Sequence, residues 1–326
     1  MKKIVFRVAL WAITILCLYF AFRKIEWETF WTHITGANPL WITCAVLLTC
    51  ISYLLRSRRW QFLFPRPVIN YFDSVRVLIL GFFMNNILPA RTGEFVRAHL
   101  GAKVTGETRT LVLATIASER LADGLTLSLM FVVFAFGLSN AEHRTDFMYV
   151  AVLFAVASVL VLITLFVKAQ VFTLADRINQ RIDSKLSNYT FNRLQVFING
   201  LTPLTARKQL PYITLWSIVI WCVELLVYVC ISQAFGAHLS GSYCVLFMVA
   251  VNFSSLIPAA PGGLGVIELI TSSVLVSVGV GRELALSMVV VQHVIQYLVV
   301  GIPGALVMAS WKKMRKEIEE VEHEQA

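Results

Sequence analysis

Three ionisable side chains lie in the middle of one long apolar stretch, where a charge is expensive to bury. They are Glu119, Arg120 and Asp123, within the apolar run 110–138. Glu119 and Asp123 are four residues apart and would share one helix face, and Arg120 can pair with Asp123 three residues later. Charged residues inside membrane helices face the protein interior and mark binding sites or ion pathways. The pattern fits a site for a charged headgroup, and it fits equally an ion pair that only fixes helix packing.

Two more ionisable residues, Glu224 and His293, lie within the apolar runs 211–235 and 284–310. Buried carboxylates and imidazoles form proton relays in membrane proteins, so we take both residues as candidates for such a relay. For His293 the pattern favours the simpler alternative, which is a packing histidine that makes a hydrogen bond.

Two apolar segments are interrupted by proline and glycine in similar ways. The segment 82–97 reads FFMNNILPARTGEFVR, and the segment 251–270 reads VNFSSLIPAAPGGLGVIELI. Each contains a polar residue, two aliphatic residues, Pro and Ala, with a Gly four residues after the Pro. Proline removes a helical hydrogen bond and glycine permits unusual backbone angles, so a helix should break at both places. The residues expected to break the helices are Pro89, Gly93, Pro258, Pro261, Gly262 and Gly263.

Paired broken segments suggest a site for a transported substrate. Backbone groups freed by a helix break are tolerated at membrane depth only where they are buried in protein or line a wet cavity. Broken segments in both halves of a membrane protein therefore point to a transport site between them. The alternative is two unrelated proline kinks in ordinary membrane spans.

Charged residues surround the broken segments. Arg91 and Arg97 flank Glu94, and the planar fork of an arginine matches a phosphate. The alternative is an interfacial anchor, which the pattern favours strongly for Arg97 and less for Arg91. A helix beginning near 262–265 would also offer backbone N–H groups to an anion. We expect Arg91 and Arg120 to contact phosphate, and the carboxylates to contact an amine or relay protons. The residues expected to contact substrate are Asn86, Arg91, Glu94, Arg97, Glu119, Arg120, Asp123, Asn252 and Glu268.

The composition places the chain in the membrane class. Of 326 residues, 58% are hydrophobic and 14% are charged, against about 25% charged in soluble domains, and the mean hydropathy is +0.73. The formal charge is +9, and the basic residues lie between the apolar runs, where they would contact lipid headgroups. The sequence has no zinc or helix-turn-helix pattern, so we expect no nucleic acid as a partner. The six cysteines form no CxxC pair and no Walker A or HExxH motif occurs. We therefore expect no metal, no cofactor and no enzymatic activity.

Basic residues predict the topology. They cluster at the start of the chain, after the run 39–55, in a polar insert and after the last run, so both termini should be cytoplasmic at the inner membrane. The run 74–90 has basic residues on both sides, which fits a re-entrant hairpin, and the runs 243–260 and 264–280 form a second one. We predict an all-α polytopic membrane protein with about six full spans and two re-entrant hairpins, related as an inverted repeat. The apolar runs are 4–22, 39–55, 74–90, 110–138, 147–167, 211–235, 243–260, 264–280 and 284–310.

The chain contains no Gly/Ser-rich or Pro-rich linker. Residues 1–311 are therefore predicted to form one membrane domain, followed by a charged cytoplasmic tail at 312–326. Within this domain, the polar insert 168–210 has spaced apolar residues between basic ones, as in a helix that lies on the cytoplasmic leaflet. A plain connecting helix would show the same pattern. The spaced residues are Val171, Leu174, Ile178, Ile182 and Leu186.

Four motifs together resemble the lysylphosphatidylglycerol synthase transmembrane-region family of flippase-like proteins. They are RSRRW at 56–60, NNILPARTGEFVRAH at 85–99, ASERLADG at 117–124 and PAAPGGLGVIE at 258–268. The resemblance implies a membrane domain with inverted re-entrant repeats that handles lipids. In the bifunctional members of the family, this domain moves aminoacylated phospholipids and a separate soluble domain makes them. The chain ends about fifteen residues past the last apolar run, so we expect no such soluble domain here.

The expected function is therefore that of a lipid flippase or transporter with membrane lipids as its partners. The alternatives are an integral membrane enzyme that acts on a lipid-linked substrate, and a partner subunit of such an enzyme. The sequence leaves open the lipid, the direction, the energy source and the oligomeric state, with a homo-oligomer as one option.

Overall fold

The computed structural model describes residues 2–88, 93–135, 185–257 and 261–324, with scattered positions between 149 and 177. Side chains are described from Leu10 onward, except in 185–190 and 311–324. Every regular element in these ranges is a helix, which confirms the expected all-α class. Several predicted features lie outside the described residues: Pro89, Arg91, Pro258, the connection 139–146, most of the run 147–167 and the first part of the polar insert.

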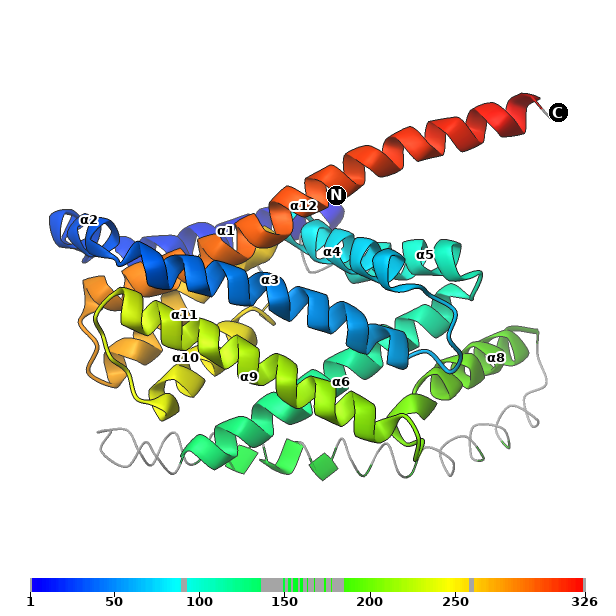
Figure 1. The fold of residues 1–326 in the computed structure, drawn as a ribbon, viewed down its shortest axis with the longest axis horizontal. Helices are drawn as coiled ribbons and strands as arrows, with labels where there is room; N and C mark the ends of the chain where they lie inside the picture. The colour runs from blue at the N-terminus through cyan, green and yellow to red at the C-terminus, as the bar shows by residue number, and fades with distance from the viewer. Residues whose placement is uncertain are drawn as a thin grey trace.

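Two long antiparallel helices, α3 (Pro39–Phe62) and α9 (Leu210–Ala234), form the centre of the fold (Figure 1). The backbone N–H of Asn38 donates to the Ala234 carbonyl at 2.8 Å, which joins the start of α3 to the end of α9. At the opposite end, the Gln209 side chain donates to the Phe64 carbonyl at 3.1 Å. These two bonds fix both ends of the pair.

Three described helices are long and apolar enough to cross a membrane, namely Pro39–Phe62, Leu210–Ala234 and Arg282–Ser310, the last being part of α12 (Arg282–Glu324). Shorter apolar helices occupy Leu10–Phe22 of α1 (Lys2–Phe22), α10 (Gly241–Ser254) and Pro261–Ser277. The helix α6 (Arg109–Ala135) is 27 residues long and contains the charged residues described above. A polytopic membrane protein is therefore confirmed, while the exact number of spans stays a prediction.

Both expected breaks separate two helices that pack against each other as a hairpin. Hairpin 1 consists of α4 (Tyr71–Ile87) and α5 (Gly93–Thr105). Hairpin 2 consists of α10, the 3-10 turn η4 (Pro261–Gly263) and α11 (Val266–Ser277). Hairpin 1 follows the end of α3 and hairpin 2 follows the end of α9, so they start from opposite ends of the central pair (Figure 1).

Glycines let the two helices of hairpin 1 approach closely. A Cβ atom added at Gly93 would lie 2.4 Å from the backbone oxygen of Gly81 and 2.5 Å from the backbone nitrogen of Asn85. A Cβ atom at Gly81 would lie 2.8 Å from Cβ of Arg97. Because backbone atoms cannot move aside, a larger residue at Gly93 would separate the helices.

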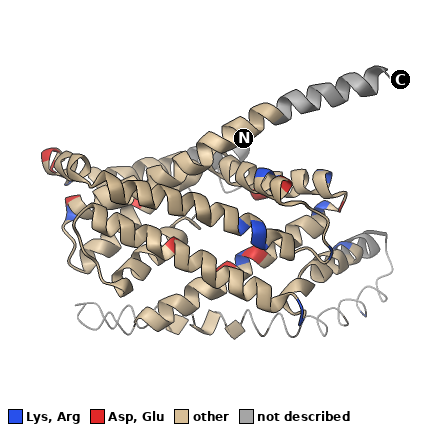
Figure 2. Ribbon diagram, in the orientation of Figure 1, with Lys and Arg blue, Asp and Glu red and all other residues tan. Residues whose placement is uncertain are grey.

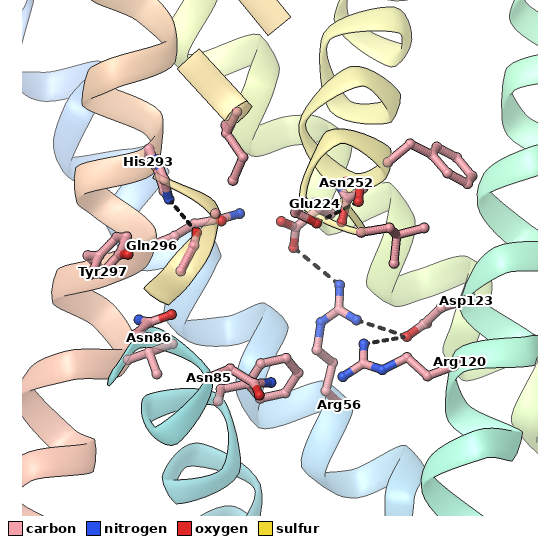
Figure 3. Close-up of a pocket in the computed structure, with 18 of the residues that line it drawn as sticks. Arg56, Asn85, Asn86, Arg120, Asp123, Glu224, Asn252, His293, Gln296 and Tyr297 are labelled. Carbon is pink, nitrogen blue, oxygen red and sulfur yellow. Dashed lines mark hydrogen bonds and ion pairs between the residues drawn. The ribbon is translucent and has the colours of Figure 1, made fainter. Parts of the chain in front are cut away.

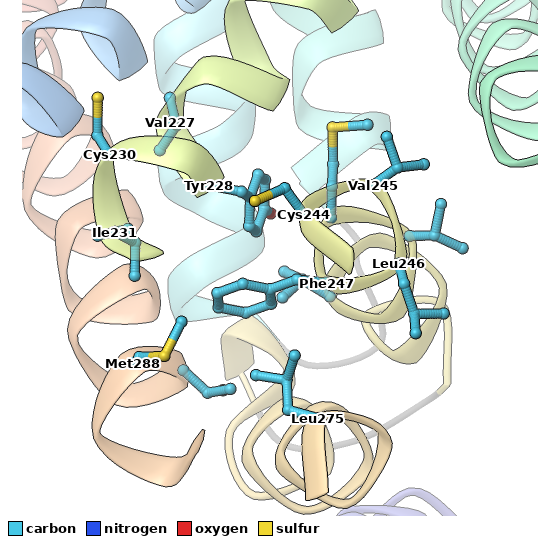
Figure 4. Close-up of a cluster of buried hydrophobic side chains, with 14 of the residues drawn as sticks. Val227, Tyr228, Cys230, Ile231, Cys244, Val245, Leu246, Phe247, Leu275 and Met288 are labelled. Atoms are coloured by element: carbon cyan, nitrogen blue, oxygen red, sulfur yellow. The ribbon is translucent and has the colours of Figure 1, made fainter. Parts of the chain in front are cut away.

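An apolar cluster holds hairpin 2 against α9 and α12. The rings of Tyr228 and Phe247 meet edge to face with their centroids 4.9 Å apart, and Leu275 and Met288 are fully buried beside them (Figure 4). Lipid tails are as apolar as these side chains, so contact with lipid does not drive the helices together. Such contacts therefore stabilise the fold through close packing. The short flanking helices α2 (Trp27–Gly36) and α8 (Lys185–Gly200) pack on α12 and α6 respectively.

Candidate functional site

A cavity of about 410 Å³ lies where the two hairpins meet. The end of α4 contributes Asn85 and Asn86, and hairpin 2 contributes Asn252, Gly262 and Gly263. Side chains of α3, α6, α9 and α12 complete the wall (Figure 3). The volume falls in the range of small-molecule sites, and the wall combines apolar side chains with a few polar groups, as such sites do.

Asp123 is the centre of the charged part of the wall. Its Oδ1 accepts from Nη1 of Arg59 at 2.6 Å and from the indole N–H of Trp221 at 3.1 Å. Its Oδ2 accepts from Nη1 of Arg56 at 3.3 Å. Both oxygens of this buried carboxylate are therefore engaged by donors from α3 and α9.

Glu224 is tied into the same cluster from α9. Its Oε2 accepts from the Ser52 hydroxyl at 2.7 Å and lies 3.6 Å from Nη2 of Arg56. The Arg56 guanidinium also lies over the Trp221 ring, 5.1 Å from its centroid. Arg56 thus bridges the two carboxylates, Asp123 and Glu224 (Figure 3).

Arg120 has a different main partner from the one expected. Its Nε donates to Oε1 of Glu94 at 2.8 Å, while its Nη1 is 4.0 Å from Oδ2 of Asp123. The predicted pair with Asp123 is therefore only a secondary contact. The Arg120 side chain is 32% exposed, against 8% for Asp123 and 7% for Glu224, so it is the most exposed of these three residues, all of which line the cavity.

Arg97 and Glu119 form a buried two-pronged ion pair. Nη1 and Nη2 of Arg97 donate to the two Glu119 oxygens at 3.3 and 2.7 Å, and the guanidinium stacks on Trp60 at 4.2 Å. The alternative of Arg97 as an interfacial anchor is wrong, because the residue is 1% exposed. Neither partner lines the cavity.

The charges of this region balance. Figure 2 shows acidic and basic residues gathered where α3, α6 and α9 lie together. Balanced charge is what a buried cluster requires, since an unpaired charge away from water is strongly destabilising. The four arginines are Arg56, Arg59, Arg97 and Arg120, and the four carboxylates are Glu94, Glu119, Asp123 and Glu224.

Arg56 and Arg59 are functional candidates that the sequence interpretation missed. It placed them with the cytoplasmic basic flank of a span, yet they are 7% and 0% exposed and face the protein interior. The available signal was their spacing, because residues three apart share a helix face. Residues of the cavity wall that were also missed are Tyr53, Phe82, Asn85, Trp221 and Tyr297.

His293 connects hairpin 2 to α12. Its Nδ1 lies 2.6 Å from Oε1 of Glu268, and its Nε2 lies 3.2 Å from the Gly262 carbonyl. Both neighbours are acceptors, so both contacts are hydrogen bonds only when each ring nitrogen carries a proton. This geometry agrees with the interpretation of His293 as a hydrogen-bonded packing residue.

Glu268 caps the helix that begins beside it. Its Oε2 accepts from the Gly265 backbone N–H at 2.6 Å, at the start of α11. The protein's own carboxylate therefore occupies the Gly265 N–H, one of the backbone donors that we expected to face an anion. Glu268 does not line the cavity, whereas His293, Gly262 and Gly263 of this group do.

Replacing His293 with leucine should lower the free energy of unfolding by about 2–3 kcal/mol, since a hydrogen bond to the buried Glu268 carboxylate is lost at similar side-chain volume. Tyr297→Phe is the matched control, because its hydroxyl makes one hydrogen bond to the Pro261 carbonyl of the same turn at 2.9 Å. That variant should lose only about 1 kcal/mol. Unfolding in detergent measures both, and equal losses would contradict the proposed role of the His293–Glu268 pair.

One protein-family profile matches a stretch of the sequence that contains every residue of the site described above. The profile described as the lysylphosphatidylglycerol synthase TM region matches residues 4–304. A UPF0104 membrane protein of Pyrococcus horikoshii is 24% identical over 299 residues, covering 85% of this chain and 89% of the relative. Another from Methanothermobacter thermautotrophicus is 26% identical and covers 83% of each chain.

A longer relative carries a different name. The glycosyltransferase AglD of Haloferax volcanii is 23% identical over 313 residues, which is 84% of this chain but 49% of AglD. No solved structure matches the chain significantly. Because the family profile spans nearly all of the sequence, the chain belongs to the lysylphosphatidylglycerol synthase transmembrane-region family.

Proposed function

We propose that this protein moves a phospholipid or another lipid-linked headgroup across the inner membrane, through the cavity between the two hairpins, with both termini in the cytoplasm. The observation that carries the proposal is the position of the cavity. Two broken helical hairpins that start from opposite ends of the fold both line it. In transporters, broken helices of this kind form the substrate site near the middle of the bilayer.

The helix contacts support an inverted repeat. One unit consists of α3, hairpin 1 and α6, and the other consists of α9, hairpin 2 and α12. Exchanging the units preserves the packing: α4 contacts α12 as α10 contacts α6, and α5 contacts α6 as α11 contacts α12. Each hairpin thus packs on the last helix of both units. Such an arrangement allows one unit to rock against the other around a fixed site.

The balanced charge cluster supports movement of a charged headgroup. Arg120 lines the cavity with a partly exposed side chain while its Nε stays on Glu94, and an arginine can hold a phosphate with its remaining N–H groups. Asp123 and Glu224 keep Arg56 paired meanwhile. A phosphate can therefore enter without leaving another charge unpaired. Arg91 remains a proposed second phosphate contact.

Proteoliposomes that contain labelled lipids test this proposal. Replacing Arg120 with glutamine should slow translocation about tenfold or more, since a hydrogen-bonding charge that faces the substrate is lost. Arg58→Gln is the matched control, because Arg58 is an exposed arginine near the same cluster that bonds only Gln61 among the described residues. Equal rates for Arg120→Gln and the wild type, across all lipids that the wild type moves, would contradict the proposal.

The second candidate function is an integral membrane enzyme, or a partner subunit of one, that acts on a lipid-linked substrate. The observation that favours it is the similarity to a protein named as a glycosyltransferase, of which this chain matches 49% of the length. Activity in detergent separates the two candidates. An enzyme should turn over lipid substrate without a bilayer, whereas a flippase should show activity only in sealed vesicles.

A further inference from the structure

The charged part of the cavity wall is already occupied by internal partners. Asp123 accepts from Arg56, Arg59 and Trp221, and Glu224 accepts from Ser52 and pairs with Arg56. Both carboxylates are less than 10% exposed. An ammonium group that took Asp123 would have to displace an arginine, and one at Glu224 would compete with Ser52 and Arg56 for Oε2.

Displacing Arg59 would be especially unfavourable. This residue is fully buried, its Nη1 bonds Asp123 and Ser217, and its Nε and Nη2 already make no hydrogen bond to described residues. Removing Asp123 from it would leave a buried cation without compensation. The charged part of the wall is therefore suited to an anion beside Arg120, and poorly suited to an added cation.

The other part of the wall is uncharged and rich in amides. Asn85 and Asn86 come from α4, and Gln296 comes from α12, close to His293 and Tyr297 (Figure 3). None of these three amide side chains hydrogen-bonds another described residue. Oδ1 of Asn85 is buried against Gly93 within hairpin 1 and has no partner among the described residues, so Asn85 would meet a ligand through its NH₂ group. Amide groups that line a cavity without protein partners can bond a ligand that supplies both donors and acceptors.

Amides and hydroxyls are matched chemically. Each amide offers both an acceptor oxygen and a donor NH₂ group, and each hydroxyl can accept and donate in turn. A headgroup with several adjacent hydroxyls could bond Asn86, Gln296 and the NH₂ group of Asn85 together, while an ammonium group could only donate.

We infer that the cavity selects a lipid phosphate that carries an uncharged, hydroxyl-rich headgroup, such as glycerol or a sugar, over one that carries an amine. This inference rests on the proposed function, but what it predicts is the affinity of the cavity for different lipids. The phosphate would lie against Arg120, and the hydroxyls would lie against the three amides. The two natural sources of this chemistry are a glycerophospholipid and a polyprenyl phosphate sugar.

Binding to the full chain in detergent tests the selectivity. The probes are phosphatidylglycerol, a polyprenyl phosphate that carries one hexose, phosphatidylethanolamine and an aminoacylated phosphatidylglycerol. Native mass spectrometry, or the shift in unfolding temperature with lipid concentration, gives the affinity. At least one hydroxylated lipid should bind about tenfold more tightly than both amine lipids. The stronger of the two hydroxylated probes identifies the source.

Variants of the amides test the location. The double variant Asn86→Leu, Gln296→Leu should weaken binding of the hydroxylated lipid about five- to thirtyfold, since two hydrogen bonds are lost. Binding of phosphatidylethanolamine should stay unchanged, a difference that general unfolding would not produce. Gln195→Leu, at an exposed position of α8, is the matched control and should bind all probes as the wild type does.

The outcomes separate this inference from the proposed function. Tighter binding of an amine lipid would overturn the inference, as would an equal loss of affinity for all probes in the double variant. If that amine lipid were also translocated, the proposed function would remain intact. Selective binding of a hydroxylated lipid, with no translocation above the Arg120→Gln variant, would uphold the inference and overturn the proposed function.

Discussion

Replacing Asp123 with asparagine should abolish lipid translocation and lower the free energy of unfolding by about 3–5 kcal/mol, because it breaks a buried ion-pair cluster from one side. The change preserves size but removes the negative charge that faces Arg56 and Arg59 at 3.3 and 2.6 Å. Arg59 has no exposed surface through which water could compensate. Unfolding in detergent and translocation in proteoliposomes measure the two effects.

The chain provides a matched control for this change. Asp73 also pairs with an arginine, Arg76, at 3.5 Å, but the two side chains are 29% and 55% exposed. Exposed ion pairs contribute little, so Asp73→Asn should change the free energy of unfolding by less than about 1 kcal/mol and leave translocation unchanged. A similar loss of unfolding free energy in Asp123→Asn and Asp73→Asn would show that the contribution of Asp123 to stability does not depend on its burial.

The positions of the helix breaks could be predicted from the sequence because their cause is local. Proline and glycine act on their own backbone, and α4 indeed ends at Ile87 and α5 begins at Gly93. The presence of buried charge on α6 was predictable for the same kind of reason, because the charged residues stand within one apolar run.

The partners of those charges could not be predicted in the same way. Arg59 and Asp123 are 64 residues apart, and Ser52 and Glu224 are 172 residues apart. These contacts depend on how helices rotate and cross, which a local pattern does not define. Arg56 and Arg59 illustrate the problem, because basic residues at the end of an apolar run suit both a cytoplasmic flank and an interior ion pair.

The aligned glycines of the two hairpins also have different roles. Gly262 lies in the turn η4 with φ of 70°, in the left-handed region that favours glycine. Gly93 lies in the first turn of α5, where close approach to Gly81 requires it. Hence the shared motif correctly indicated two breaks, but the physical reason for each glycine became clear only from the packing.

Replacing Gly93 with alanine should force apart the two helices of hairpin 1. The new methyl group would lie 2.4 Å from the Gly81 backbone oxygen, and neither backbone can move without disturbing Asn85 in the cavity wall. Overpacking of this kind lowers the free energy of unfolding by about 1–3 kcal/mol. Translocation should fall further than stability suggests, because the cavity loses its shape along with its hairpin.

Gly301→Ala is the matched control, since Gly301 lies within α12 and a Cβ atom there would meet no atom within 4 Å. Alanine should raise stability at this site by about 0.5–1 kcal/mol, because it restricts the unfolded chain more than glycine does. Wild-type translocation by Gly93→Ala would show that the close contact within hairpin 1 does not shape the cavity. Lost translocation in Gly93→Ala, with wild-type rates in Gly301→Ala, would connect one tight backbone contact to the geometry of the transport site.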